Sequence, residues 1–600
     1  MKRILTSLLL GASLLLPAVA GATLADPVTE RACGFDLDHD GTVAEAGDCT
    51  FCDGSTTDPD GDTRNERIAY VDCGSGSDNV DCGASGTPCA TIKYAHENII
   101  PEMTPATEEW IICFQGSTCQ LENFDPGKSV RNTHEDCPSY GAEAVGTAQC
   151  STNPNRLIGW DTDADGSYPP FDADDNAIIT GRSNGNSMIR GNSGTEMLDF
   201  SMAHFEVNEY LSRSLSPATS GAKTKNFIDL NEGFQRIEMH DFYGFGILKE
   251  QPKCGGFRTW AMFVGSQDDA TDLLVRNVEM IERGGYGMRG GVSSGNERGP
   301  IIFAGYEATG HTCEGSECPP DGSSWCSGSD TSWEGWNCLG KIWGDISQMY
   351  FTDVSCDSGL GSNWTSYQRG IIQGMVVNDN QQDINFTRCY FEDMKTGILF
   401  QPDLSGSGVT HRNVDNVTIV DSWFHWTANS TDLFKNSSGR STQTGVHVES
   451  ADDGDGDVGH VENLTIQNTA FTSVDGIKSA IVDQSGTYSG SDAPGVHTFQ
   501  HITINANPAG SDSAATGLIS IGGKWQPNSV GFPSNPADNF VIENIVMAGN
   551  DSTDGNNYGI YVFANSQAVN DVFTLDDISS DADLNHYWTS STDLAAFATA

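Results

Sequence analysis

Short segments in which apolar and polar residues alternate recur from about residue 199 to residue 577. Each begins with Asn or Asp, continues as apolar, any, apolar, any, and ends again with Asn or Asp. The clearest copies are Asp272–Asn277, Asn416–Asp421, Asn463–Asn468 and Asn539–Asn544. Alternation with a period of two predicts a short β-strand that has one face in a core. Asn and Asp tolerate a left-handed backbone, so they are typical of the turns that bound such strands.

Less regular copies fill the intervals between the clear ones and complete a repeat. They are Asp199–His204, Arg236–Asp241, Gln348–Asp353, Asp383–Arg388, His501–Ala506 and Val572–Asp577. Successive sixth positions lie 33 to 47 residues apart, except for one gap of 76 residues before Asp353. A steady period of this length predicts a stack of similar units. The long gap contains residues 305–345, which we expect to be an excursion with room for one hidden unit.

A second short strand, usually opened by Gly, follows within each unit, as at Gly397–Gln401 and Gly445–Glu449. The connections are rich in Gly, Ser and Asn and lack helical periodicity, which argues against leucine-rich and helical repeats. A propeller blade would need four strands in about 40 residues, whereas two or three fit here. The pattern therefore predicts an all-β, parallel β-helix, a solenoid in which each coil adds one strand to each of several parallel sheets.

At this point the sequence resembles the pectate-lyase-like family of exported, right-handed parallel β-helix proteins. The segment from Asp72 to Ala95, D-C-G-S-G-S-D followed by S-G-T-P-C-A-T-I-K-Y-A, is similar to the N-terminal cap segment common in that family. The resemblance covers roughly residues 70–590. Because the repeats begin near residue 197, we expect a cap and first irregular coils over residues 73–196 and a β-helix over 197–590. It implies no activity, because this architecture hosts lyases, hydrolases, adhesins and phage tailspikes. The catalytic motifs of the family's pectate lyases and polygalacturonases do not occur in the sequence.

The first twenty residues predict export. Lys2 and Arg3 precede an apolar run over residues 4–16, and Ala18-Val19-Ala20 offers a cleavage site, as in a secretory signal peptide. Seventeen Cys in an exported chain predict disulfides, and ten of them lie between Cys33 and Cys150. We expect two more disulfides to hold the excursion, among Cys313, Cys318, Cys326 and Cys338. No stretch after residue 30 has 18 consecutive apolar residues, so we expect no insertion into a membrane.

The formal net charge of −51 makes nucleic acid and anionic membrane poor partners, because phosphate groups would be repelled. Two interpretations of the acidity remain open. A solvated acidic surface keeps an exported protein soluble, and particular clusters of carboxylates bind divalent cations.

Residues 26–72 form a Cys- and Asp-rich segment with two such clusters. Alternate carboxylates followed by Gly can wrap around one calcium ion, which prefers six to eight hard oxygen ligands. The segment resembles the calcium loops of thrombospondin type 3 repeats and dockerins. The expected ligands of structural calcium are Asp36, Asp38, Asp40, Thr42, Asp48, Asp58, Asp60 and Asp62. The alternative is a solvated acidic linker.

A polar group on the outside of the second strands is the candidate catalytic site. If the first and third residues after each Gly enter the core, the second and fourth face outward. The residues expected to gather there are Gln401, His447, Glu449 and Lys478. A lyase for acidic sugars would use a cation to bind the carboxylate and Lys or His to remove the neighbouring proton. Paired carboxylates would suit a glycoside hydrolase, and ordinary polar residues on a solvated sheet are the third interpretation.

Two further regions are candidates for substrate binding. Ten of the 31 Lys and Arg lie between Lys223 and Arg298, among them Lys249 and Arg289. The excursion contains Trp325, Trp333 and Trp336, and exposed Trp faces stack on sugar rings. We therefore expect a secreted protein that binds, and as an enzyme cleaves, an extracellular polysaccharide. The alternative is a non-enzymatic adhesive or structural protein of the cell surface.

Overall fold

The structure is a computed structural model of the whole chain. It describes residues 52, 65–100, 108–121, 124, 155–162, 176–181, 188–190, 197–208, 226–230, 234–245, 260–266, 270–283, 286–292, 300–310, 337–343, 346–358, 373–377, 381–401, 414–427, 443–449, 451–452, 458–459, 461–474, 476–483, 496–506, 516–521, 540–548, 557–562, 573–580 and 585–589.

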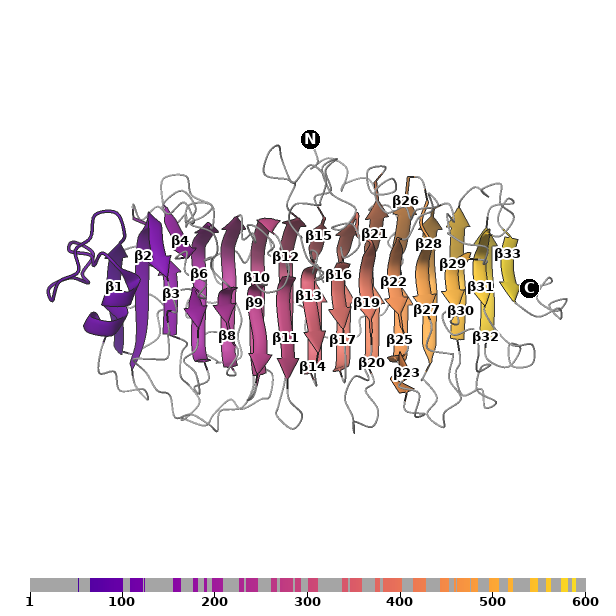
Figure 1. The fold of residues 1–600 in the computed structure, drawn as a ribbon, viewed down its shortest axis with the longest axis horizontal. Helices are drawn as coiled ribbons and strands as arrows, with labels where there is room; N and C mark the ends of the chain where they lie inside the picture. Colours follow the sequence, from indigo (N-terminus) through magenta and orange to yellow (C-terminus); the bar gives the residue numbers. More distant parts are fainter. Residues whose placement is uncertain are drawn as a thin grey trace, which may run out of the picture.

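Two parallel sheets wind around one elongated core, with each coil stacked on the one before (Figure 1). Sheet A has 19 strands: β1 Asn65–Asp72, β2 Glu108–Leu121, β3 Asn155–Gly159, β4 Ala177–Gly181, β6 Met197–Asn208, β8 Phe234–Phe245, β10 Ala270–Arg283, β12 Ile301–Gly310, β14 Ile346–Thr352, β15 Ser355–Asp357, β17 Gln381–Thr387, β18 Tyr390–Glu392, β20 Val414–Val420, β21 Trp423–Trp426, β25 Val461–Gln467, β26 Ala470–Ser473, β28 His497–Asn505, β30 Phe540–Ala548 and β32 Phe573–Ser580.

Sheet B has 12 strands and closes the other side of the core: β5 Ile189–Arg190, β7 Asn226–Asp229, β9 Trp260–Ser266, β11 Tyr286–Val292, β13 Asn337–Trp343, β16 Gln373–Val377, β19 Thr396–Phe400, β22 Thr444–Val448, β27 Ser479–Asp483, β29 Thr516–Ile521, β31 Asn557–Val562 and β33 Asn585–Thr589. A small antiparallel pair, β23 Ala451–Asp452 and β24 Val458–Gly459, lies apart from both. The prediction of an all-β parallel β-helix is confirmed. Strands that precede residue 197 already belong to its sheets.

Sheet A bends sharply at the sixth position of the sequence repeat. Eight of these corner residues have a left-handed backbone, with φ between 47° and 59°: His204, Asp241, Asn277, Asp353, Arg388, Asp421, Asn468 and Asn544. In four coils the first position is left-handed as well, at Gln348, Asp383, Asn416 and Asn463. Few side chains other than Asn and Asp tolerate this region. The repeat therefore marks two bends that flank one strand.

Two features of the repeat differ from the sequence-based prediction. In β28 the corner residue is His501, with φ of 53°, and not Ala506. Gln500 and Ile502 pair with Glu543 and Ile545, so His501 lies level with the corner residue Asn544. The hidden coil inside the 76-residue gap is β12, where Gly305 has φ of 64° and its α-carbon faces Asn277. The missing corner is thus a Gly, which the Asn/Asp pattern could not detect.

Columns of stacked side chains fill the core, and they explain the Gly that opens the second strands. Phe391, Phe424 and Phe471 stack with ring centroids 5.0 and 4.9 Å apart. A Cβ on Gly397 would lie 2.4 Å from the Phe424 ring, and one on Gly445 would lie 2.5 Å from the Phe471 ring. The rings of sheet A therefore occupy the volume in which sheet B would otherwise carry a side chain.

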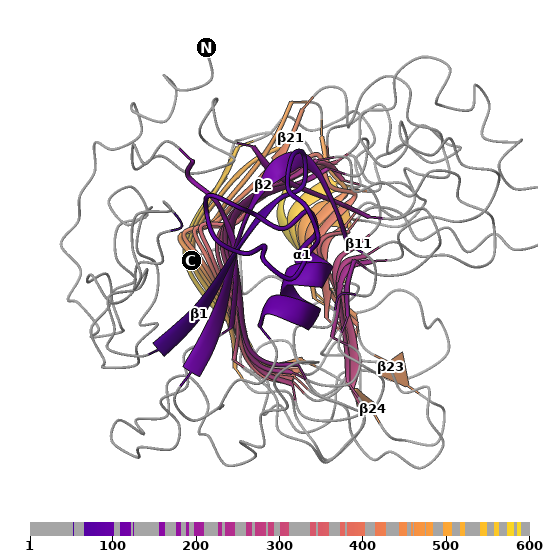
Figure 2. The ribbon, with the colours of Figure 1, turned by 90° about the vertical axis from the view of Figure 1, so that its left-hand side faces the viewer.

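The N-terminal end of the core is covered by a short helical segment. Helix α1, Ile92–Tyr94, continues into a π-helical turn, η3, over Ala95–Ile99. Figure 2 shows α1 lying across the end of the coil, between the strands of the two sheets. Ile92 and Ala95 are buried in the main core. The segment therefore closes an end at which apolar side chains would otherwise meet water.

Disulfides join Cys52 to Cys113, Cys73 to Cys119, Cys82 to Cys89 and Cys338 to Cys356. Several disulfides indicate an oxidising, extracellular environment. The expected pairing of Cys338 within the excursion is wrong, since its partner Cys356 lies in the next coil. Cys389 is a free and buried thiol among the described cysteines. None of the described helices is long and apolar enough to cross a membrane.

Gly397→Ala should lower the free energy of unfolding by about 1–3 kcal/mol, because the added methyl group must displace the Phe424 ring or the backbone of Gly445. The matched control is Gly86→Ala, where a Cβ meets nothing within 4 Å. Thermal or chemical denaturation of both variants measures the difference. Equal stability of the two variants would contradict the account of the glycines.

Candidate functional site

Strands β19 and β22 carry the predicted outward residues in adjacent coils of sheet B. Ile398 pairs with Val446 and Phe400 with Val448, and all four side chains are buried in the core. Leu399 pairs with His447, which lies on the opposite face. Gln401 and Glu449 follow directly at the strand ends and are half-buried.

Three of the predicted residues lie together, and two of them share a hydrogen bond. The side-chain amide of Gln401 donates to Oε2 of Glu449 at 2.8 Å, and Nδ1 of His447 lies 4.0 Å from Oε1 of Glu449. The side chains of His447 and Glu449 are only 16% and 33% exposed. Nε2 of His447 is buried and has no hydrogen bond within the described part of the chain. This group is more deeply set than the solvated sheet face that alternation alone would suggest.

Lys478 reaches the same group from a different place than the sequence predicts. The rule used for the second strands places Lys478 two residues after an opening Gly, Gly476, and therefore level with His447. The strand of this coil is instead β27, and His447 pairs with Val482. The backbone N–H of Lys478 donates to the carbonyl of Gln443 at 2.9 Å, just before β22. The predicted register is wrong because Ala480, and not Gly476, takes the place of the opening Gly in this coil. The backbone of Gly445 packs against the carbonyl of Ala480.

A second lysine lies in line with Lys478. The backbone N–H of Thr444 donates to the carbonyl of Lys395 at 2.8 Å, so Lys395, Gln443 and Lys478 occupy equivalent places on three consecutive coils. Burial lowers the pKa of Lys395, and the positive charge of Lys478 lowers it further. Lys395 therefore loses its proton more readily than a solvated lysine, a property that sequence reasoning did not attribute to any residue here.

Burial also shifts the other titrating groups of this face. It lowers the pKa of His447 to about 3, with a further lowering by Lys478 and an opposing effect of Asp483. Burial raises the pKa of Glu449, while the hydrogen bond from Gln401 and the charge of Lys478 oppose that rise. The result is a neutral imidazole beside a carboxyl group that holds its proton more strongly than usual. We call Gln401, His447, Glu449, Lys395 and Lys478 the sheet B cluster.

The remaining sequence-based candidates are not brought to this cluster. Arg289 lies in β11, where its α-carbon pairs with those of Phe263 and Lys341, several coils away. The other predicted binding residues and the predicted calcium ligands lie outside the described residues; they are Lys249, Trp325, Trp333, Trp336, Asp36, Asp38, Asp40, Thr42, Asp48, Asp58, Asp60 and Asp62.

An aromatic surface that the sequence analysis did not single out lies on the outer face of sheet A. Tyr390 and Trp423 stand at paired positions of β18 and β21, with ring centroids 5.1 Å apart. Trp423 is 42% exposed, and its indole N–H donates to the hydroxyl of Thr472 at 2.7 Å. Its position directly after the corner residue and Ser422 is the signal that would have placed it outside.

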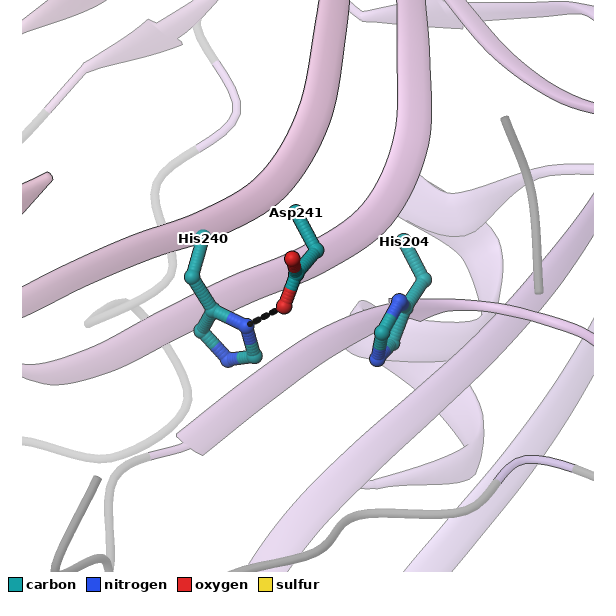
Figure 3. Close-up of side chains that lie close together, drawn as sticks. All are labelled: His204, His240 and Asp241. Carbon is teal, nitrogen blue, oxygen red and sulfur yellow. Dashed lines mark hydrogen bonds and ion pairs between the residues drawn. The ribbon is translucent and has the colours of Figure 1, made fainter. Parts of the chain in front are cut away.

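A second cluster gathers two histidines and an aspartate at the corner of sheet A (Figure 3). One ligand atom from each of His204, His240 and Asp241 lies within 4.8 Å of the others. Nδ1 of His240 is 2.9 Å from Oδ2 of Asp241, and the two imidazole rings meet edge to face at 5.7 Å. All three residues are buried, with 4% to 7% of their surface exposed.

Burial lowers the pKa of His204 to about 4, in spite of the nearby charge of Asp241. Burial alone would raise the pKa of Asp241, but hydrogen bonds with His240 and Asn277 and the histidine charges together hold it below its usual value. The sequence repeat contained His204 and Asp241 as turn residues. Their position on adjacent coils was therefore predictable, but their burial and the approach of His240 were not.

No protein-family model matches this chain, and a search of curated proteins finds no similar sequence.

His447→Leu, which introduces the residue found at the paired position Leu399, should make the protein less sensitive to acid. The folded protein keeps His447 neutral down to about pH 3, whereas the unfolded chain takes up a proton below about pH 6.5. Wild-type stability is therefore fully present above about pH 6.5 and is lost as the pH falls toward 3.

Between about pH 7.5 and about pH 4.5, the free energy of unfolding should fall by about 2 kcal/mol more in the wild type than in His447→Leu. Chemical denaturation at the two pH values measures this difference. Thr503→Val, a change at an exposed residue that does not titrate, is the control and should behave as wild type. A variant that loses as much stability as wild type would show that His447 is not held neutral.

Proposed function

We propose that this protein binds an acidic extracellular polysaccharide on the outer face of sheet B and cleaves it by β-elimination. The observation that carries the proposal is the sheet B cluster, in which the charge of Lys478 acts on Lys395, on a neutral histidine and on a carboxyl group with a raised pKa. Perturbed titrating groups that gather in one place are typical of functional sites. An ordinary solvated face would leave these groups near their usual pKa values.

Each side chain has a role that its environment supports. The charge of Lys478 binds the uronate carboxylate and thereby makes the proton on the adjacent carbon more acidic. Lys395, whose pKa is lowered, takes that proton as the base. His447, with its pKa of about 3, is too weak a base for this step, so its neutral imidazole helps to hold Glu449 in place instead.

The reaction balances within these groups. Lys395 removes the proton from the carbon beside the carboxylate, a carbon–carbon double bond forms, and the glycosidic carbon–oxygen bond breaks. The departing oxygen needs a proton, which Glu449 donates because its raised pKa favours the protonated form. No water or oxidant is consumed, so the scheme requires nothing beyond substrate and the cluster.

A separate aromatic pair on the outer face of sheet A also suits a glycan. Tyr390 and Trp423 present adjacent rings on consecutive coils, and such faces stack on the apolar faces of sugars. Parallel coils repeat about every 4.8 Å, so one surface can follow an extended polymer across several coils. The resemblance to pectate-lyase-like proteins agrees with this class of ligand, and the proposed signal peptide of residues 1–20 would export the protein to it.

The decisive experiment incubates the mature protein with uronate-containing and neutral glycans and follows the ultraviolet absorbance of unsaturated products. Lys395→Met should lower the rate of cleavage at least about 100-fold, while binding of the glycan persists. Lys478→Met should weaken binding of uronate glycans. Lys93→Met, an exposed lysine of α1, is the matched control.

Three outcomes are informative. Cleavage that fails only in the cluster variants supports the proposal. Binding without any product identifies the alternative, a non-enzymatic adhesive or structural protein. If the protein neither binds nor cleaves any glycan, the proposal of a polysaccharide function is refuted.

We also propose that the acidic N-terminal segment binds structural calcium through Asp36, Asp38, Asp40, Thr42, Asp48, Asp58, Asp60 and Asp62. Removing calcium should lower the melting temperature, and adding calcium back should restore it, because the ion stabilises only the folded loops. The double variant Asp38→Asn and Asp60→Asn should lose the response. A melting temperature that is indifferent to calcium would refute this proposal.

A further inference from the structure

The corner of sheet A is built differently in the coils of β6 and β8 than in later coils. The corner residues Arg388, Asp421 and Asn468 are exposed, and Asp353 is partly exposed; Arg388 and Asp353 meet in a two-pronged ion pair at 2.7 and 2.8 Å. At the same corner His204 and Asp241 are 4% exposed. His204 and Asp241 are therefore buried, although the turn itself does not require burial.

The register of the coils brings these residues together. Phe205 pairs with Phe242, so the residues just before them, His204 and Asp241, lie one above the other on adjacent coils. His240 precedes Asp241 and points outward beside it, with its α-carbon level with that of Ala203. Figure 3 shows the Asp241 carboxylate between the two imidazole rings. The backbone register therefore places the three residues on adjacent coils of one corner.

We propose that His204, His240 and Asp241 form a binding site for one divalent transition-metal ion, for which Zn²⁺ is the natural probe. Two imidazole nitrogens and one carboxylate oxygen suit zinc and its neighbours, whereas calcium and magnesium prefer oxygen ligands alone. The three ligand atoms already lie within 4.8 Å of one another. Zinc bonds of about 2.0–2.1 Å require ligand atoms about 3.4 Å apart, so small side-chain rotations close the site.

A neighbouring residue already orients the carboxylate. Nδ2 of Asn277, the corner residue of the next coil, donates to Oδ1 of Asp241 at 3.2 Å. The other oxygen, Oδ2, shares a hydrogen bond with Nδ1 of His240, so a metal ion would take the place of the proton between these two atoms. Outer hydrogen bonds of this kind fix the orientation of ligands in metal sites. Three protein ligands leave further coordination positions for water or an anion, as in zinc sites that are not purely structural.

The test titrates Co²⁺ and then Zn²⁺ into the chelator-treated, full mature protein, in excess calcium so that the acidic N-terminal segment is occupied. Wild type should take up one equivalent of Co²⁺ with visible absorption bands, and Zn²⁺ should displace it. His204→Asn, His240→Ala and Asp241→Asn should each weaken binding at least about 100-fold, and Asn277→Gly about 10- to 100-fold.

Each substitution introduces a residue that other coils carry at the corresponding place: Asn at Asn468, Ala at Ala203 and Gly at Gly305. Unchanged melting of the metal-free variants checks that they fold. His501→Asn is the matched control, since His501 occupies the same corner of a distant coil. A wild type that takes up no Co²⁺, or variants that bind it as wild type does, would overturn the proposal. Because the readout is metal binding, either result is independent of glycan cleavage.

Discussion

The left-handed backbone at the corner of each coil is the constraint on which the solenoid depends. Parallel strands can continue from coil to coil only if the chain leaves the sheet at the same place in every turn. A corner residue with φ near 50° makes that turn in one step, and its neighbours in adjacent coils repeat it. The columns of Phe rings and the glycines opposite them are in register because the corners are. Both clusters inherit their positions from the same alignment.

Much of the fold was predictable, because the corner and the buried strand both select side chains. Asn and Asp mark the left-handed positions, and the alternating apolar residues between them mark the inward face. The prediction failed where another residue meets the same demand. Gly305 makes a corner without Asn or Asp, and His501 does so where Ala506 seemed to complete the pattern. Ala480 stands where Gly was expected, which shifted the predicted strand and misplaced Lys478.

The candidate sites were less predictable, because their chemistry depends on burial and on contacts across coils. The alternation of residues correctly predicted that His447 faces away from the core. It could not predict the low pKa of His447, which burial and Lys478 produce together. Lys395 lies two coils before Lys478, and only the register of the coils connects them. His204 and Asp241 were visible as repeat positions. The sequence could not reveal that the side chains of His240 and Asn277 would both contact Asp241.

The uneven distribution of disulfides has a mechanical consequence. The described cross-links all precede residue 357, and residues 390–600 contain no cysteine. In a solenoid each coil contacts mainly its neighbours, so coils can detach one by one from an end. A pulling force along the molecule would therefore peel the C-terminal coils progressively while the cross-linked N-terminal part stays intact. The cross-linked N-terminal part would therefore resist such a force better than the coils that follow it.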